Sequence, residues 1–206
     1  MELNHLISHL QTCKICLSPE QMEQLKKYLT LLLKWNKAFN LTAIGEKEFL
    51  PKHILDSLSV AQYLDGESFV DVGTGAGLPG IPLAIHLPQI QFTLVDSNSK
   101  KIRFIRQVIS ELDIKNVQPI HARIEALDKS APFDGVISRA FASIPKMLSL
   151  CEGLLKPQGL YYAMKAKLAD QEVEKLPDGY QMVNNYTLMV PGLAADRRLV
   201  CIKKIQ

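Results

Sequence analysis

An acidic side chain and closely spaced glycines occur together in one stretch, Ser68 to Pro82, and this combination suits a ligand site. A short β-branched and aromatic run, Phe69 to Val72, leads into four glycines: Gly73, Gly75, Gly77 and Gly80. Glycines let a backbone turn sharply and approach a ligand where a Cβ would intrude. A run with helical character follows. The stretch therefore predicts a strand, a tight turn and a helix start, the opening of a nucleotide-binding βα unit.

Asp71, two residues before the first glycine, narrows the class of ligand. The glycines alone fit the dinucleotide pattern G-x-G-x-x-G, which plain turns also produce. A carboxylate at this point would repel a pyrophosphate. S-adenosylmethionine has no phosphate and carries an α-ammonium and a sulfonium, so an acid suits it. The order Asp-x-Gly-x-Gly-x-Gly resembles the first motif of class I methyltransferases. The alternative is that Asp71 caps the glycine turn, and the two roles are compatible.

Polar residues also follow the next three predicted strands. Asp96 ends the second strand, where a carboxylate can accept both ribose hydroxyls of an adenosine; the alternative is a cap on the next helix. Ile124 and Glu125 follow the third strand, where backbone amides and an acid can contact an adenine edge. A surface salt-bridge turn is the alternative there. Arg139 follows the fourth strand, where a methyl acceptor would meet the sulfonium.

The elements that must position these residues alternate in type. Strands are predicted at 69–72, 91–96, 117–121, 133–138 and 159–164, and helices at 81–87, 100–112 and 144–155. Alternation implies an α/β fold with a mostly parallel, Rossmann-like sheet and helices on both faces, as in class I methyltransferases. Ligands then bind outside the carboxyl ends of the strands. Residues 180–190 and 197–203 lack an intervening helix, so we expect an antiparallel strand at one edge.

Residues 1–66 are predicted to be a small helical region ahead of a methyltransferase domain at residues 67–206. Ser18, Pro19 and Gln21 form a helix start with a capping box, and Asn40 marks the end of that helix. Further helices are expected at 3–10 and 53–64. Seven lysines balance seven acids in this region, so the net charge of +3 arises from residues 67–206.

Composition indicates a cytoplasmic protein with reduced thiols. The first residues do not resemble a signal peptide, and no segment approaches the ~18 apolar residues of a membrane span. We expect a monomer. Cys13 and Cys16 form a C-x-x-C pair, but a zinc site needs two further ligands at suitable spacing, so no metal is expected.

The residues after the fourth predicted strand narrow the chemistry. Exocyclic-amine methyltransferases typically carry Asn/Asp-Pro-Pro-aromatic there, whereas this chain has Ser138-Arg139-Ala140-Phe141. Carbon-5 pyrimidine methyltransferases need a nucleophilic cysteine, and the nearest one, Cys151, lies in an apolar run typical of a core. Guanine N7 holds an in-plane lone pair and has no proton to lose, so positioning and electrostatics suffice for its methylation. An Arg on N7 would block transfer, so Arg139 is expected at O6, a phosphate or the cofactor carboxylate.

Four motifs in this order and spacing resemble the bacterial small-subunit ribosomal RNA guanine-N7 methyltransferases, the glucose-inhibited division protein B family. They are Trp35 to Thr42, His53 to Ser57, the glycine stretch, and Phe133 to Ala142. The resemblance implies methyl transfer from S-adenosylmethionine to one guanine N7 of 16S ribosomal RNA, with the small subunit or its precursor as partner. It also implies cofactor contacts at Gly73, Leu78, Ile124, Glu125 and Arg139. Ala76 and Cys201 depart mildly from the family pattern.

Basic residues predict the RNA surface. Lys100, Lys101, Arg103 and Arg106 form a run without acids, and Lys165, Lys167, Arg197 and Arg198 lie near strand ends or in loops. A solvated helix face is the alternative for the first group. His53 and Asp56 share a helix face and either line the acceptor side or make a structural hydrogen bond. Two other functions stay open. One is a module that binds S-adenosylmethionine and RNA without catalysis. The other is an NAD-dependent oxidoreductase, although Asp71 argues against it.

Overall fold

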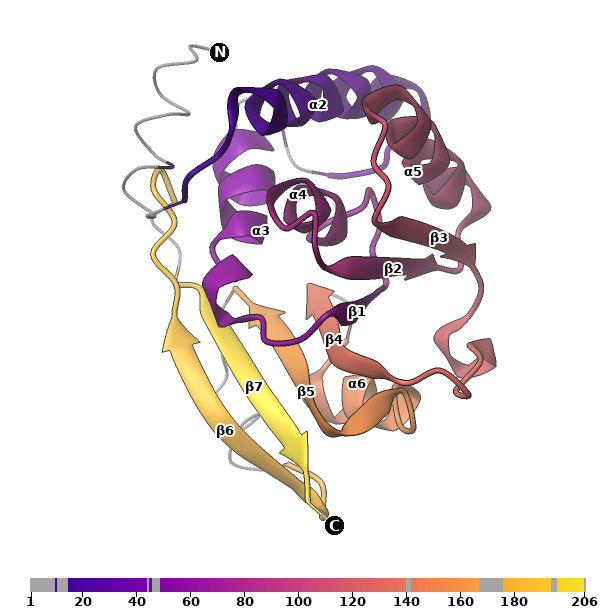
Figure 1. The fold of residues 1–206 in the computed structure, drawn as a ribbon, viewed down its shortest axis with the longest axis vertical. Helices are drawn as coiled ribbons and strands as arrows, with labels where there is room; N and C mark the ends of the chain where they lie inside the picture. Colours follow the sequence, from indigo (N-terminus) through magenta and orange to yellow (C-terminus); the bar gives the residue numbers. More distant parts are fainter. Residues whose placement is uncertain are drawn as a thin grey trace.

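A seven-stranded sheet forms the centre of the molecule, and its order is β3-β2-β1-β4-β5-β7-β6 (Figure 1). The computed structural model describes Leu10 and residues 15–43, 45, 49–139, 142–166, 176–193 and 196–205. The strands are β1 (Ser68–Val72), β2 (Gln91–Asp96), β3 (Val117–His121), β4 (Phe133–Arg139), β5 (Leu155–Lys165), β6 (Tyr180–Thr187) and β7 (Arg198–Lys204). Neighbours among β1 to β5 are parallel, whereas β7 pairs with β5 and β6 in antiparallel sense. The predicted α/β class and antiparallel edge are confirmed.

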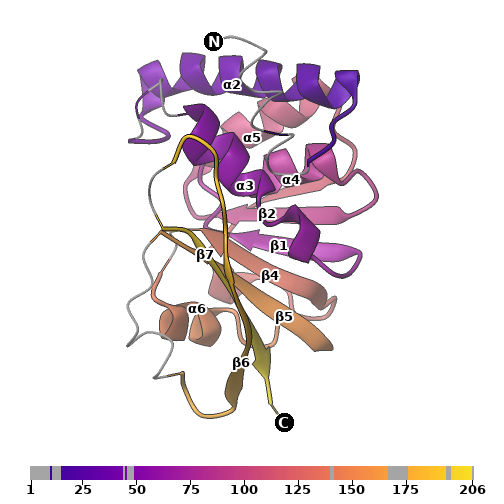
Figure 2. The same cartoon turned by 90° about the vertical axis from the view of Figure 1, so that its left-hand side faces the viewer.

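Helices cover both faces of the sheet, which explains why the interior strand β1 carries buried apolar residues on both sides (Figure 2). Phe69 of β1 faces one core, and Val70 and Val72 face the other. The Phe69 side carries α2 (Pro19–Phe39), α3 (Asp56–Leu58), α4 (Gly80–His86) and α5 (Ser99–Leu112). The opposite side carries α6 (Ile144–Leu150). Short helical turns are η2 (Leu50–Leu55), η3 (Ala61–Tyr63) and η4 (Ile124–Ala126).

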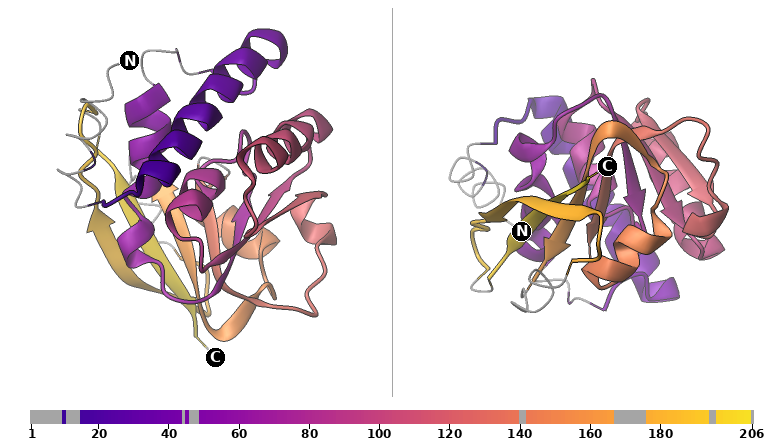
Figure 3. Two further views of the ribbon diagram at one scale, coloured as in Figure 1. Left: turned by 45° about the horizontal axis from the view of Figure 1, so that its top comes forward. Right: turned by 90° about the horizontal axis from the view of Figure 1, so that it is seen from below.

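The long helix α2 begins and ends where its sequence predicts. Ser18 and Gln21 form the reciprocal capping box, and Asn40 takes the left-handed conformation (φ 49°) at the carboxyl end. The helix lies beside α5 and contacts α4 (Figure 3). Its buried Tyr28 donates a hydrogen bond to the Ala76 carbonyl at 2.8 Å, so α2 is fixed directly to the glycine turn. The division between residues 66 and 67 stays a prediction.

Two predicted helices differ in the structure. The helix expected at 144–155 ends at Leu150, because Gly153 turns the chain with φ +80° and β5 begins at Leu155. The segment expected as one helix from residue 53 to 64 is divided among the π-helical η2, the short α3 and the 3-10 turn η3. The helix expected at 3–10 lies outside the described residues except for Leu10.

Candidate functional site

Two cavities lie at the carboxyl ends of the parallel strands, and Gly73 lines both. The first has a volume of about 550 Å³, and its wall includes Asp96 from the end of β2 and residues Ile124 and Glu125 of η4. The second has a volume of about 580 Å³, and its wall is formed by the glycine turn, η2 and the ends of β4, β5 and β7. This is the edge at which parallel α/β sheets bind ligands.

Asp71 lies beneath the glycine turn, fully buried. Its Oδ2 accepts hydrogen bonds from Thr74 Oγ1 at 2.6 Å and from the Gly80 amide at 2.9 Å. Its Oδ1 is buried and has no hydrogen-bond partner among the described residues. Burial raises the pKa of the carboxyl to about 6, although both hydrogen bonds oppose the shift. Asp71 thus makes the turn contacts of the capping alternative, and it lines neither cavity.

Two of the turn glycines meet different constraints. Gly75 has φ +62°, and a Cβ added to it would have no neighbour closer than 4.0 Å, so its Cα faces open space in the second cavity. Gly77 has φ +87°, and a Cβ there would stand 2.5 Å from Ile81 Cγ1. Gly75 therefore leaves room for a ligand, whereas Gly77 allows the turn to pack on α4 and lines neither cavity.

Asp96 connects the turn to the start of α5. Its Oδ2 accepts from the Gly75 amide at 2.9 Å, and its Oδ1 accepts from the Asn98 amide at 2.8 Å. The N-cap of α5 is Asn98, whose side chain accepts from the Lys100 amide, so Asp96 supports the cap residue rather than capping the helix itself. Lys101 Nζ lies 3.6 Å from Asp96 Oδ2. Each carboxylate oxygen has capacity for a second hydrogen bond in the first cavity.

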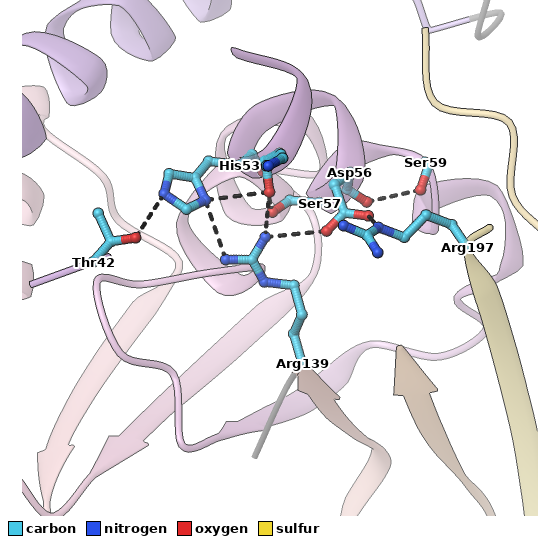
Figure 4. A network of polar contacts seen from close by, with 8 residues as sticks. Thr42, His53, Asp56, Ser57, Ser59, Arg139 and Arg197 are labelled. Atoms are coloured by element: carbon cyan, nitrogen blue, oxygen red, sulfur yellow. Dashed lines mark hydrogen bonds and ion pairs between the residues drawn. The ribbon is translucent and has the colours of Figure 1, made fainter. Parts of the chain in front are cut away.

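A buried carboxylate holds two arginines in the second cavity (Figure 4). Asp56 Oδ2 accepts from Arg139 Nη1 at 3.1 Å, and Asp56 Oδ1 accepts from Arg197 Nε at 3.0 Å. Arg139 Nη1 also donates to the Lys52 carbonyl at 2.7 Å. The Asp56 side chain is only 4% exposed, and those of Arg139 and Arg197 are 18% and 15% exposed. The two cations therefore share one carboxylate in a largely dry environment.

His53 lies beside this cluster and is neutral at neutral pH. Its Nε2 is 3.1 Å from Thr42 Oγ1, and its Nδ1 is 3.2 Å from the Lys52 carbonyl oxygen and 3.5 Å from Arg139 Nη2. Burial, together with the charge of Arg139, lowers the pKa of His53 to about 4. His53 thus adds hydrogen-bonding capacity to the wall of the second cavity without adding another positive charge. His53 and Asp56 make structural hydrogen bonds and also line the second cavity, while their place on the acceptor side stays a prediction.

The structure divides the predicted site residues into three groups. The first cavity holds Gly73, Asp96, Lys101, Ile124 and Glu125. The second holds Gly73, Gly75, Leu78, Arg139, Lys165 and Arg197. Asp71, Gly77, Lys100, Arg103 and Arg106 line neither cavity; the first two are internal, and the three cations lie exposed on α5. Lys101, predicted with the RNA surface, instead lies beside Asp96. Lys167 lies outside the described residues.

Sequence analysis did not single out several cavity residues. Lys146 and Ser143 at the start of α6 line the first cavity, and Lys52, Thr42 and Met164 line the second. In the sequence, Thr42 stands out only as the last residue of the motif from Trp35 to Thr42. Its position three residues after the end of α2 is the local feature that could have placed it at the strand-end edge.

No cluster of His, Cys, Asp and Glu suited to a metal ion occurs in the part of the chain that the structure describes. Cys16 is an exposed free thiol, and Cys13 lies outside that part. None of the described helices is long and apolar enough to cross a membrane.

Comparisons with known proteins identify the family. The profile of a family described as GidB, rRNA small subunit methyltransferase G, matches residues 21–201. The chain is 50% identical over 98% of its length to the Ribosomal RNA small subunit methyltransferase G of Escherichia fergusonii, and the match covers 98% of that protein. This chain belongs to the GidB family. The resemblance predicted from the sequence motifs is therefore confirmed.

Solved structures with low sequence identity show the same fold. A ribosomal protein L11 methylase from Lactobacillus delbrueckii subsp. bulgaricus matches with a TM-score of 0.57 at 14% identity, covering 79% of this chain and 81% of that one. A precorrin-6y C5,15-methyltransferase from Geobacter metallireducens matches with a TM-score of 0.54 at 18% identity, covering 81% and 92%. The GidB chain thus has the fold of class I methyltransferases.

Proposed function

We propose that this GidB protein transfers a methyl group from S-adenosylmethionine to N7 of a guanine in 16S ribosomal RNA. The observation that carries the proposal is the pair of cavities that meet at Gly73. A cofactor in one and a nucleotide in the other would face each other across this residue. Family membership and the fold support the same reaction.

The first cavity fits the adenosine part of S-adenosylmethionine. Its wall combines the carboxylates of Asp96 and Glu125 with apolar surface from Val95, Ile124 and Leu150. Asp96 would accept from the ribose hydroxyls, and η4 would contact the adenine. The unpartnered Asp71 Oδ1 leaves an unsatisfied acceptor beneath the turn, which suits a cationic ligand above it. When bound, the cofactor would supply an electrophilic methyl group on a sulfonium sulfur.

The second cavity fits a nucleotide with its phosphates. Five cationic side chains line it, against the single carboxylate of Asp56: Lys52, Arg139, Lys165, Arg197 and Arg198. Such a surface attracts a polyanion and gives salt-dependent affinity. Lys165 Nζ donates to the Ala142 carbonyl at 3.0 Å, which fixes it at the junction between the end of β5 and the start of α6.

Positioning is the main catalytic contribution that this chemistry requires. Guanine N7 has an in-plane lone pair and no proton, so no residue has to act as a general base. Arg139 would hold guanine O6 or an adjacent phosphate and thereby align N7 with the methyl group. Asp56 and the Lys52 carbonyl fix the guanidinium from behind. Because His53 is neutral, it does not compete with Arg139 for an anionic group.

The substrate must present an unpaired guanine. N7 of a base in an RNA helix faces a deep, narrow groove that side chains cannot enter. The target is therefore a base in a single-stranded loop or one rotated out of its stack. We place the reaction on the small ribosomal subunit or its precursor in the cytoplasm, with the protein acting as a monomer.

Calorimetry tests the cofactor half of the proposal. The protein should bind S-adenosylmethionine or its demethylated product, and NADH poorly. Tight NADH binding without S-adenosylmethionine binding would instead favour the oxidoreductase.

Methyl transfer from labelled S-adenosylmethionine tests catalysis, with naked RNA and small subunits lacking the modification as parallel substrates. Arg139→Ala should lower the single-turnover rate even when both ligands saturate. Lys203→Ala removes a cation near the amino ends of the parallel strands, away from both cavities, and should leave the rate unchanged. A chain that binds both ligands but transfers no label would be the non-catalytic module.

A further inference from the structure

Phe39, the last residue of α2, exposes an aromatic ring that the proposed reaction does not use. Phe39 keeps 43% of its surface exposed. By contrast, Tyr28 of α2 and Phe104 of α5 are fully buried. Trp35 supports the Phe39 ring from one side, with centroids 5.0 Å apart and planes tilted by 39°. Trp35 is anchored in turn by Phe104 at 5.6 Å and by a hydrogen bond to Gln107 at 3.0 Å. The exposed ring thus packs on a tryptophan that two residues of α5 hold in place.

A lysine lies over this ring, and further cations are exposed on the two helices that carry the ring and the lysine. Lys100 Nζ lies over it, 6.0 Å from the centroid. Arg103 and Arg106 are exposed on the same helix, whose residues 99–110 contain no acid, and Lys37 lies in the last turn of α2. An exposed aromatic ring among cations matches the chemistry of single-stranded nucleic acid, whose bases stack on rings while its phosphates pair with lysine and arginine.

Phe39 and Lys100 are both close in sequence to residues that line the two cavities. Leu41 and Thr42, two and three residues after Phe39, line the second cavity. Asp96, four residues before Lys100, lines the first. An RNA segment whose guanine entered the second cavity would therefore pass close to Phe39.

We infer that Phe39, backed by Trp35 and with Lys100 over its ring, forms a stacking platform for an unpaired base that neighbours the target guanine. The inference rests on the proposed function for its RNA substrate and assigns to that substrate a second contact outside the cavities. Stacking accepts any base, so the platform adds affinity for unpaired RNA without adding sequence specificity.

The only tryptophan of the chain reports on the platform directly, because it is Trp35 itself. The full chain is titrated with single-stranded oligoadenylate while the Trp35 emission is followed, without any methyl donor. Wild-type protein should bind with a change in emission. Phe39→Ala and Phe39→Leu should weaken binding by about fivefold to 100-fold, the loss expected for one stacked base, and Phe39→Tyr should restore it. Phe39→Leu keeps an apolar side chain at the helix end, so it separates loss of the ring from loss of packing.

Ile205→Ala is the matched control. Ile205 is 48% exposed and follows β7 at the amino ends of the parallel strands, opposite the cavities, so its removal should not change the affinity. The inference is overturned if Phe39→Leu binds oligoadenylate as tightly as wild type, or if wild type does not bind it. A fully paired RNA duplex that changes the Trp35 emission equally would also overturn it.

The two proposals fail separately. The platform alone would be refuted if wild type methylates small-subunit RNA and Phe39→Leu binds oligoadenylate normally. The enzymatic function alone would be refuted if oligoadenylate binding depends on the Phe39 ring but no methyl transfer occurs.

Discussion

Removing the Asp56 carboxylate should destabilise the protein at the second cavity. Asp56→Ala leaves Arg139 and Arg197 facing each other without their shared counter-charge. Arginine side chains carry a positive charge in proteins, so the variant keeps two cations in a largely buried site. The account therefore predicts a loss of stability together with a loss of methyl transfer, because Arg139 would no longer be held in place.

The contacts set the size of the effect. The variant loses two charge-assisted hydrogen bonds, of 3.1 Å and 3.0 Å, each worth about 1.5–3 kcal/mol. Partial exposure of both arginine side chains, and the remaining bond from Arg139 to the Lys52 carbonyl, reduce the total. We expect a loss of about 2–4 kcal/mol in the free energy of unfolding. For a chain of this length that corresponds to a fall of roughly 4–16 °C in Tm.

Urea denaturation of wild type and variants measures this loss, and Glu152→Ala is the matched control. Glu152 pairs with Lys204 at 2.8 Å, but both side chains are more than half exposed, so solvent screens the pair and its removal should have little effect on stability. The double variant Asp56→Ala, Arg197→Ala should lose less than the sum of the single changes, because one unpaired charge is gone. A loss for Asp56→Ala no larger than for Glu152→Ala would refute the reasoning.

Three further predictions concern the turn and its surroundings. Asp96→Ala should weaken S-adenosylmethionine binding by about tenfold to 100-fold in calorimetry; unchanged affinity would mean that Asp96 only supports the turn. Gly77→Ala should lower stability by about 1–3 kcal/mol because of its positive φ and the contact with Ile81, whereas Gly45→Ala, with open space around it, should be neutral in the same denaturation assay. The pKa of His53 falls from 6.5 unfolded to about 4 folded, so below pH 6.5 the unfolded chain binds a proton that the folded one excludes. Stability should then fall by up to about 3 kcal/mol between pH 6.5 and pH 4, and His53→Gln should lack that component; identical pH profiles of the two proteins would contradict this.

The parts of the site that short sequence patterns encode could be predicted. The glycine turn, the strand that carries Asp71 and the strand that ends at Asp96 each follow from a few adjacent residues, and the parallel sheet then brings the strand ends together. The capping box at Ser18 and the left-handed Asn40 were likewise local features, and both are found. Local patterns left the position of each carboxylate open, since Asp71 and Asp96 both fit either a ligand or a turn contact.

The contacts around Asp56 in the second cavity could not be predicted in the same way, because the residues that make them are distant in sequence. Asp56 reaches Arg139 across 83 residues and Arg197 across 141, and no periodicity relates them. Adjacent cations on α5 also have different partners, because they point to different sides of the helix. Lys101 lies beside Asp96, whereas Lys100 lies over the ring of Phe39. The packing of α2 on α5 brings Phe39 beside Lys100, and this packing joins two helices that are distant in sequence.

The central claim is tested most directly by identifying the methylated atom. Small ribosomal subunits that lack the modification are incubated with the protein and methyl-labelled S-adenosylmethionine, and their RNA is digested to nucleosides for mass analysis. Label should appear in 7-methylguanosine in reactions with the wild-type protein and not in reactions without protein. Label in another nucleoside, or none from a protein that binds both substrates, would contradict it.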